Sequence, residues 1–265
     1  MRQTIEKSML HATVLLFTLV IAGCGGGTST PPSTSDEEQP ELRVAAASGL
    51  ALAFAELGER FEEETGTKVT FTFGSTGQLA DQIENGAPFD VFAAANRGFI
   101  ENLDENNLLI SETLQTYAFG RIGLATTVHA PGVETPGDLL LPEVERIAIA
   151  NPAHAPYGLA AKQALQSAGV YEEIESKLVY GRNITDTLNY IETGNAEVAI
   201  IARSLTDEDS VNFYELDEEL HEPIEQTIAV IERTEKEPLA SDFIAFIFGP
   251  VGTPIMESYG YMIPE

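Results

Sequence analysis

Four loops of this chain each offer backbone N–H groups at the start of a predicted helix. The loops are Ser48-Gly49, Ser75-Thr76-Gly77, Tyr157-Gly158 and Asn183-Ile184-Thr185, and the first, second and fourth also add hydroxyl groups. The first N–H groups of a helix have no partner inside it and carry the positive end of its dipole, so they bind anions without a charged side chain. For any single loop, a helix N-cap is the alternative role of its Ser or Thr. Four such loops together predict an anion site.

The donors in these loops indicate which anion would bind. Neutral N–H and O–H groups suit a fully deprotonated oxyanion, and each hydrogen bond to a charged group contributes about 1.5–3 kcal/mol. Phosphate would carry a proton and require a carboxylate acceptor. Arg97, Arg182 and Arg203 lie near the loops, where they could assist or could pair with the many carboxylates.

The sequence gives little support for a metal site or for a hydrolase active site. His129, His154 and His221 have no ligand spacing, and a structural role is expected for His154. The lone cysteine excludes Cys-ligated metals, and neither a metal site nor a cofactor is predicted. An extracytoplasmic enzyme that holds a substrate phosphate stays open as a second hypothesis. It would need a nucleophile and a base, and no sequence motif supplies them.

The elements that position the loops alternate between strand and helix. Predicted strands cover residues 42–47, 69–73, 88–95, 147–150, 178–180, 198–202 and 212–216, with helices between most of them. This alternation predicts an α/β protein with mainly parallel sheets flanked by helices. Two long β-rich segments, residues 116–126 and 224–231, are expected to cross between two lobes. Ligands of such sheets bind beyond the carboxyl ends of the strands, where all four loops lie.

The N-terminal part has the composition of an export signal. Residues 1–23 combine a basic start with a short apolar run and small residues, which is typical of a signal peptide. The residues around Cys24 resemble a bacterial lipobox, which implies cleavage before Cys24 and a lipid on its thiol. Residues 24–41 are rich in Gly, Ser, Thr, Pro and acidic residues and predict a flexible tether. We therefore expect an extracytoplasmic, membrane-anchored lipoprotein.

The charge balance excludes one class of partner. The chain has 265 residues with 14 Lys and Arg against 42 Asp and Glu, a formal net charge of −28. This balance argues against nucleic-acid binding. With 43% hydrophobic residues the chain can bury a core.

Several stretches resemble the periplasmic molybdate-binding proteins of ABC transporters. They are AAASG at 45–49, FGSTGQLADQIENGAPFDVFAAA at 73–95, NPAHAPYGLAAKQAL at 151–165, HEPIEQTIAVI at 221–231 and GYMIP at 260–264. The resemblance spans residues 42–264 and implies a hinged, two-lobed periplasmic-binding fold. It implies lobe I from residues 42–121 and 229–265, and lobe II from 122–228.

The resemblance also implies a ligand and its contacts. Molybdate or tungstate would bind to Ser48 and Thr76, with Gly49 and Ser75 adjacent, and to the backbone N–H groups of Tyr157 and Ile184. The Tyr157 hydroxyl could take part, because Ala202 stands where some members place a ligand tyrosine. A role for Ser204 stays open. The implied function is a monomeric receptor that delivers the anion to a membrane ABC permease, with sulfate or thiosulfate as the alternative ligand.

Overall fold

The computed structural model describes residues 39–128, 130, 132–207 and 209–264. The expected signal peptide, Cys24 and most of the expected tether lie outside the described residues, as does His129. The first strand, β1 (Glu41–Ala47), begins inside the segment expected to be tether. Among the described residues no single helix is long and apolar enough to cross a membrane, although the bent pair α7 (Glu237–Ile247) and α8 (Gly252–Ser258) passes that test jointly.

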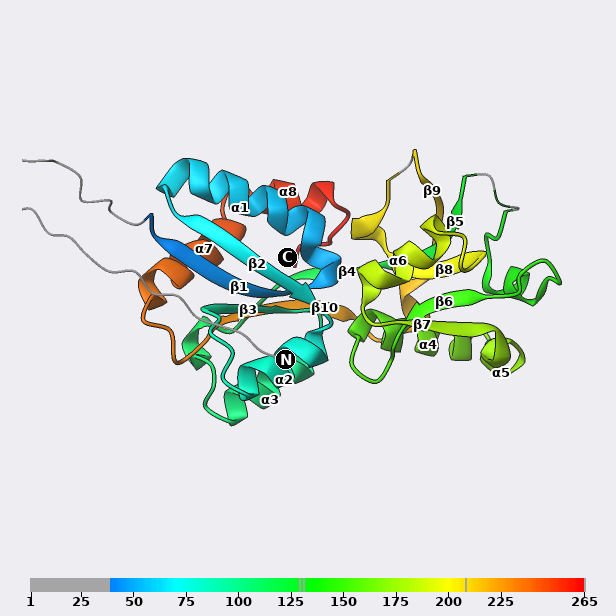
Figure 1. The fold of residues 1–265 in the computed structure, drawn as a ribbon, viewed down its shortest axis with the longest axis horizontal. Coiled ribbons are helices and arrows are strands. Elements are labelled where there is room, and N and C mark those ends of the chain that lie inside the picture. The colour runs from blue at the N-terminus through cyan, green and yellow to red at the C-terminus, as the bar shows by residue number, and fades with distance from the viewer. Residues whose placement is uncertain (1–38, 129, 131, 208, 265) are drawn as a thin grey trace, which may run out of the picture. The chain divides into compact units, whose positions relative to one another are not determined.

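Two five-stranded sheets form the body (Figure 1). The first has the order β2-β1-β3-β10-β4 and the second the order β7-β6-β8-β5-β9. The other strands are β2 (Lys68–Gly74), β3 (Val91–Ala94), β4 (Gln115–Gly120), β5 (Ile122–Thr127), β6 (Ile147–Ala150), β7 (Leu178–Gly181), β8 (Val198–Ala202), β9 (Val211–Glu215) and β10 (Ile224–Val230). We call the unit around the first sheet lobe I and the unit around the second sheet lobe II. The predicted two-lobed α/β architecture is confirmed.

Each sheet is mainly parallel, as expected, but not purely so, because one strand of each runs against the other four. In lobe I, β1 pairs in parallel with β2 and β3, but β10 is antiparallel to β3 and β4. Lobe II repeats this division, with β5 antiparallel to β8 and β9. The strand that runs against the others is β10 in lobe I and β5 in lobe II. Each is the first strand after the chain crosses from the other lobe, so it runs against the βαβ strands of the lobe that it enters. Strand direction at a crossing leaves no mark on the apolar pattern, which is why the sequence did not show it.

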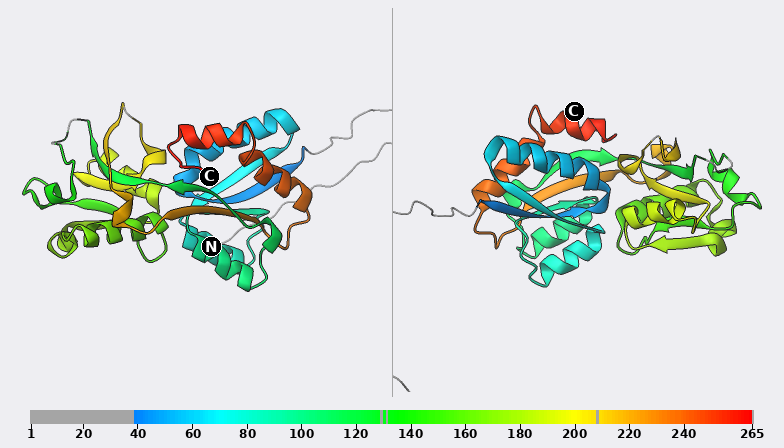
Figure 2. Two further views of the ribbon diagram at one scale, coloured as in Figure 1. Left: turned by 180° about the vertical axis from the view of Figure 1, so that it is seen from behind. Right: turned by 45° about the horizontal axis from the view of Figure 1, so that its top comes forward.

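The chain passes between the lobes twice. The first passage is short, because β4 and β5 are separated only by Arg121. The second is the segment between β9 and β10, and β10 lies entirely in the first sheet. The expected boundary between residues 228 and 229 therefore falls inside β10. Figure 2 shows β10 beside β4, as their pairing requires.

Helices cover both faces of each sheet. They are α1 (Ala51–Thr65), α2 (Thr76–Glu84), α3 (Arg97–Glu105), α4 (Pro156–Ser167), α5 (Tyr171–Ile174), α6 (Ile184–Glu192), α7 (Glu237–Ile247) and α8 (Gly252–Ser258). Alternate residues of β1 divide between two clusters: Val44 packs with Phe54 of α1, while Ala45 packs with Leu79 of α2. The sequence of a strand that is buried on both faces is a nearly continuous apolar run, and the sequence of β1 is of this kind. The sheets thus fix where each strand ends and each ligand loop begins.

Candidate functional site

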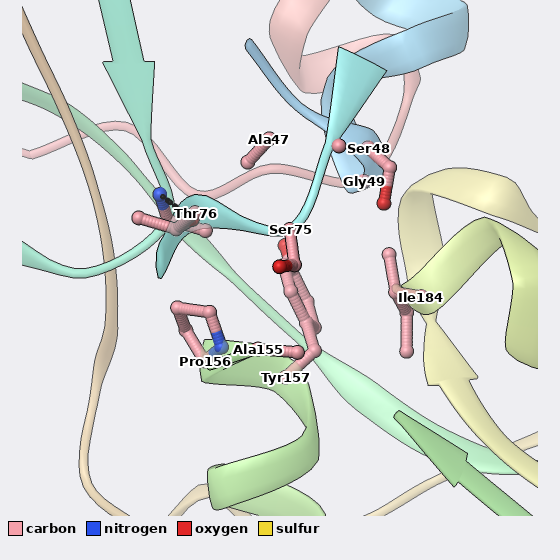
Figure 3. Close-up of a pocket in the computed structure, with 11 residues that line it drawn as sticks. Ala47, Ser48, Gly49, Ser75, Thr76, Ala155, Pro156, Tyr157 and Ile184 are labelled. Atoms are coloured by element: carbon pink, nitrogen blue, oxygen red, sulfur yellow. Dashed lines mark hydrogen bonds between the residues drawn. The ribbon is translucent and has the colours of Figure 1, made fainter. Parts of the chain in front are cut away.

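All six residues predicted to bind the anion line one cavity where the loops of the two lobes meet (Figure 3). Lobe I contributes Ser48, Gly49, Ser75 and Thr76 to its wall, and lobe II contributes Tyr157 and Ile184. The cavity is small: its internal volume is about 10 Å³, close to what a single water molecule needs. The predicted convergence of the four loops is therefore present in the structure.

The lobe I side of the cavity presents hydroxyl groups. Ser48 begins the 3₁₀ turn η1 (Ser48–Leu50) directly after β1, and Thr76 is the first residue of α2. The Ala95 N–H donates to Thr76 Oγ1 over 3.1 Å, so the hydroxyl proton of Thr76 is free to donate elsewhere. Ser75 occupies the N-cap position of α2, but its side chain makes no capping bond. The N-cap alternative thus does not explain Ser75.

The lobe II side presents backbone groups. Tyr157 is the second residue of α4, which starts at Pro156, a residue favoured at this position because it lacks an N–H. Ile184 is the first residue of α6, and the side chain of Asn183 caps that helix by accepting from the Asp186 N–H over 2.8 Å. The N–H groups of Tyr157 and Ile184 have no partner inside their helices. Lobe II therefore offers helix starts, with its capping side chain already in use.

No charged side chain is among the cavity residues. Of the three arginines near the loops, Arg97 pairs with Glu101 and Arg182 with Asp186, while Arg203 lies over the Phe213 ring. The hydrogen bond from Arg182 is the largest cause of the lowered pKa of Asp186. Within the described part of the chain, no group of three His, Cys, Asp or Glu side chains could hold a metal. Two of the three arginines therefore pair with carboxylates and the third lies over an aromatic ring, and none of the three is among the cavity residues.

The Tyr157 hydroxyl points into a buried polar cluster behind the cavity. Gln226 Nε2 donates to it over 3.4 Å, and a Cβ on Gly120 would lie 2.2 Å from it. Burial raises the pKa of Tyr157 well above its ordinary value, with Tyr261 as a further cause. The phenol is therefore neutral at physiological pH and is engaged behind the cavity, whereas the backbone N–H of Tyr157 lies at the start of α4.

His154 links the two lobes beside the site. Its Nδ1 lies 2.8 Å from Ser75 Oγ, and its carbonyl accepts the Gly77 N–H over 3.0 Å. A Cβ on Gly77 would lie 3.0 Å from the same carbonyl, so glycine is needed for this close approach. The structural role expected for His154 takes the form of a contact between the lobes. The sequence showed no sign of its partners, which lie 77 and 79 residues away.

Sequence reasoning missed part of the cavity wall. Ala47, Gly74, Ala95, Ala155 and Pro156 also line the cavity. Their small or rigid side chains carry no chemical signal, although all five lie within or directly beside the stretches that resemble the binding-protein family. Ser204, whose role was open, is not among the cavity residues.

Comparisons with known proteins agree with this geometry. Residues 42–262 match the model of the family described as bacterial extracellular solute-binding protein. The molybdate-binding protein ModA of Azotobacter vinelandii is 34% identical over 227 residues, covering 83% of this chain and 89% of the relative. A substrate-binding lipoprotein of Bacillus subtilis, YvgL, named as a putative ABC transporter component, is 26% identical over 262 residues, covering 97% of this chain and 98% of its own.

A solved structure shows the same fold. The periplasmic molybdate-binding protein of Azotobacter vinelandii superposes with a TM-score of 0.79 at 27% identity, covering 84% of this chain and all of that one. The family resemblance seen in the sequence is thereby confirmed. The chain belongs to the family of bacterial extracellular solute-binding proteins.

Proposed function

We propose that this protein captures molybdate or tungstate between its two lobes and delivers it to an ABC permease. The observation that carries the proposal is the neutral cavity, walled by Ser and Thr hydroxyls of lobe I and by helix starts of lobe II. Such donors stabilise a dianion that only accepts hydrogen bonds, and they do not require a buried counter-charge, which would itself be costly to desolvate. The relatives named as molybdate-binding support the same ligand.

The size of the cavity supports an inorganic ion. Pockets for organic ligands usually measure roughly 300–1,000 Å³, whereas this cavity measures about 10 Å³. A tetrahedral oxyanion is compact and presents four equivalent acceptors, which matches donors that arrive from four loops. A phosphate ester would need space beyond the loops for its organic part.

We propose binding without catalysis. The pair Ser75 and His154 has the spacing of a nucleophile and its base. Among the hydrogen bonds of the described residues, however, no carboxylate contacts His154 to orient it. The cavity is also too small for an ester. Relatives that are substrate-binding transport proteins point the same way. Turnover of phosphate or carboxylate esters by the purified protein would overturn this part of the proposal.

Calorimetric titration of the purified full chain with molybdate, tungstate and sulfate tests the ligand. We expect tight one-to-one binding of the first two anions and much weaker binding of sulfate, since the three share shape and charge but differ in size. Tight sulfate binding would replace molybdate by sulfate or thiosulfate as the ligand. No binding of any anion would refute the anion site.

We also propose an export signal at 1–23, a lipid on Cys24 and a tether that ends at the start of β1. The name of the lipoprotein relative supports the anchor. The receptor would then act as a monomer outside the cytoplasm, held at the membrane beside its permease. Metabolic labelling with a radioactive fatty acid tests this point. Label should appear in the wild type and be lost in Cys24→Ser, and label retained in that variant would contradict the anchor.

A further inference from the structure

Two hydroxyl groups of lobe II bind consecutive carbonyls of lobe I. Thr185 Oγ1 donates to the Ser48 carbonyl over 3.1 Å, and Ser204 Oγ donates to the Gly49 carbonyl over 2.7 Å. Neither donor is among the cavity residues, but both acceptors are. The bonds therefore reach the anion site from behind, through the peptide groups of η1.

These bonds act on the peptide groups that face a ligand. The Ser48 carbonyl and the Gly49 N–H belong to one planar peptide. A hydrogen bond accepted by that carbonyl polarises the N–H of the same group and strengthens it as a donor. The Ser48 carbonyl also accepts from the Ala51 N–H at the end of η1, so Thr185 supplies its second hydrogen bond.

The arrangement depends on closure of the lobes. Because donor and acceptor belong to different lobes, both bonds require that the two lobes be in contact at these residues. Tyr261 of lobe I donates to the same Gly49 carbonyl over 2.8 Å and lies 3.1 Å from Ser204 Oγ. Tyr261 and Ser204 are each only 4% exposed. Tyr261 can therefore keep the Gly49 carbonyl paired in an open state, while Ser204 joins it on closure.

We propose that Thr185 and Ser204 are positioning residues that couple lobe closure to anion affinity by holding the Ser48 and Gly49 carbonyls. We call this pair the carbonyl latch. The inference rests on the proposed function, since it assigns a role in the binding of that anion. It also gives Ser204 a role in lobe closure in place of contact with the ligand.

The test removes the latch hydroxyls one at a time and together. Thr185→Val and Ser204→Ala should each weaken molybdate binding about 2- to 12-fold, the loss expected for one net hydrogen bond. The double variant should lose more than either single variant, and Thr185→Ser should restore binding. Thr193→Val is the matched control, because Thr193 lies at the end of the same helix and its hydroxyl bonds only to its own lobe.

Small-angle scattering supplies a readout of closure itself. In saturating molybdate the wild type and Thr193→Val should be compact, while the double variant should keep a larger radius of gyration. Unchanged affinity and unchanged dimensions in the double variant would overturn the latch.

Different experimental results would refute the latch and the proposed function. If the wild-type protein binds no oxyanion, the proposed function is refuted, and the latch is then tested on ligand-free protein alone. There the double variant should still be more extended than the wild type and the control, and equal dimensions would refute the latch. If the wild type binds and the double variant binds equally well, only the latch fails.

Discussion

The two lobes share one topology but contribute different chemistry to the cavity. Lobe I follows the strand order β2-β1-β3-β10-β4 and lobe II the matching order β7-β6-β8-β5-β9, with the ligand loops after the first two strands of each. At corresponding helix starts stand Thr76 in α2 and Ile184 in α6. One brings a hydroxyl, and the other brings an apolar side chain and its N–H.

The N-cap residues differ in the same direction. The Asn183 side chain caps its own helix, whereas the Ser75 side chain turns to His154 of the other lobe. Hydroxyl-bearing residues of lobe I thus line the cavity, while hydroxyls of lobe II bind lobe I carbonyls. We infer that lobe I does most of the recognition by side chains and that lobe II recognises through its backbone and holds the closed state.

The largest effect is expected where the backbone of lobe II itself makes the site. A Cβ on Gly158 would lie 2.0 Å from the Ala150 carbonyl, so Gly158→Ala must displace the start of α4 from β6. We expect a loss of about 3 kcal/mol, or a decrease in Tm of about 6–12 °C, together with loss of molybdate binding. Calorimetric unfolding and titration measure both. A variant with normal Tm and affinity would show that the position of α4 is not needed.

The next effect tests side-chain recognition by lobe I. Ser48→Ala removes a hydroxyl from the cavity wall and should weaken molybdate binding about 10- to 150-fold, the range for a hydrogen bond to a charged group. The stability of the free protein should change little. Ser258→Ala is the control, since its hydroxyl bonds only within α8. Equal affinities of the two variants would remove Ser48 from the site.

A pH effect tests the polar cluster that joins the lobes. Burial raises the pKa of Tyr261 to about 12, while its bonds to Ser204 and Tyr157 lower it. Since an unfolded tyrosine ionises near pH 10, the stability that Tyr261 contributes is complete below pH 10 and is lost as pH rises toward 12. Urea unfolding at pH 9 and pH 11 should show this loss, and Tyr261→Phe should reduce it. An unchanged loss in the variant would assign the effect to other groups.

Much of the fold and of the cavity wall could be predicted from the sequence, because at the strand ends the local sequence pattern agrees with the tertiary contacts. The strands β6 and β8 have the predicted bounds, since each is a short apolar run between polar segments. Four loops with hydroxyls or helix starts pointed to one anion site, and the structure places their residues around one cavity. The family resemblance supplied the molybdate ligand, which donor chemistry alone did not distinguish from sulfate.

The remaining features depend on contacts between residues far apart in the chain. Thr185 meets Ser48 over 137 positions, and Ser204 meets Gly49 over 155. An isolated Thr or Ser has many local roles, so its type gives no sign of such a partner. The end of the second crossing was missed for a related reason. The segment 224–231 is β-rich throughout, and only its pairing with β3 and β4 assigns β10 to lobe I.

The smallest effect sharpens the contrast between the lobes. Tyr157→Phe removes the one hydroxyl that lobe II residues of the cavity wall carry, but that hydroxyl is held by Gln226 behind the cavity. We therefore expect molybdate binding to weaken only about 2- to 10-fold, less than in Ser48→Ala, through loosening of the cluster. Calorimetric titration of both variants with molybdate under the same conditions measures this difference in affinity. A loss in Tyr157→Phe equal to that in Ser48→Ala would mean that the phenol contacts the anion and that both lobes recognise it by side chains.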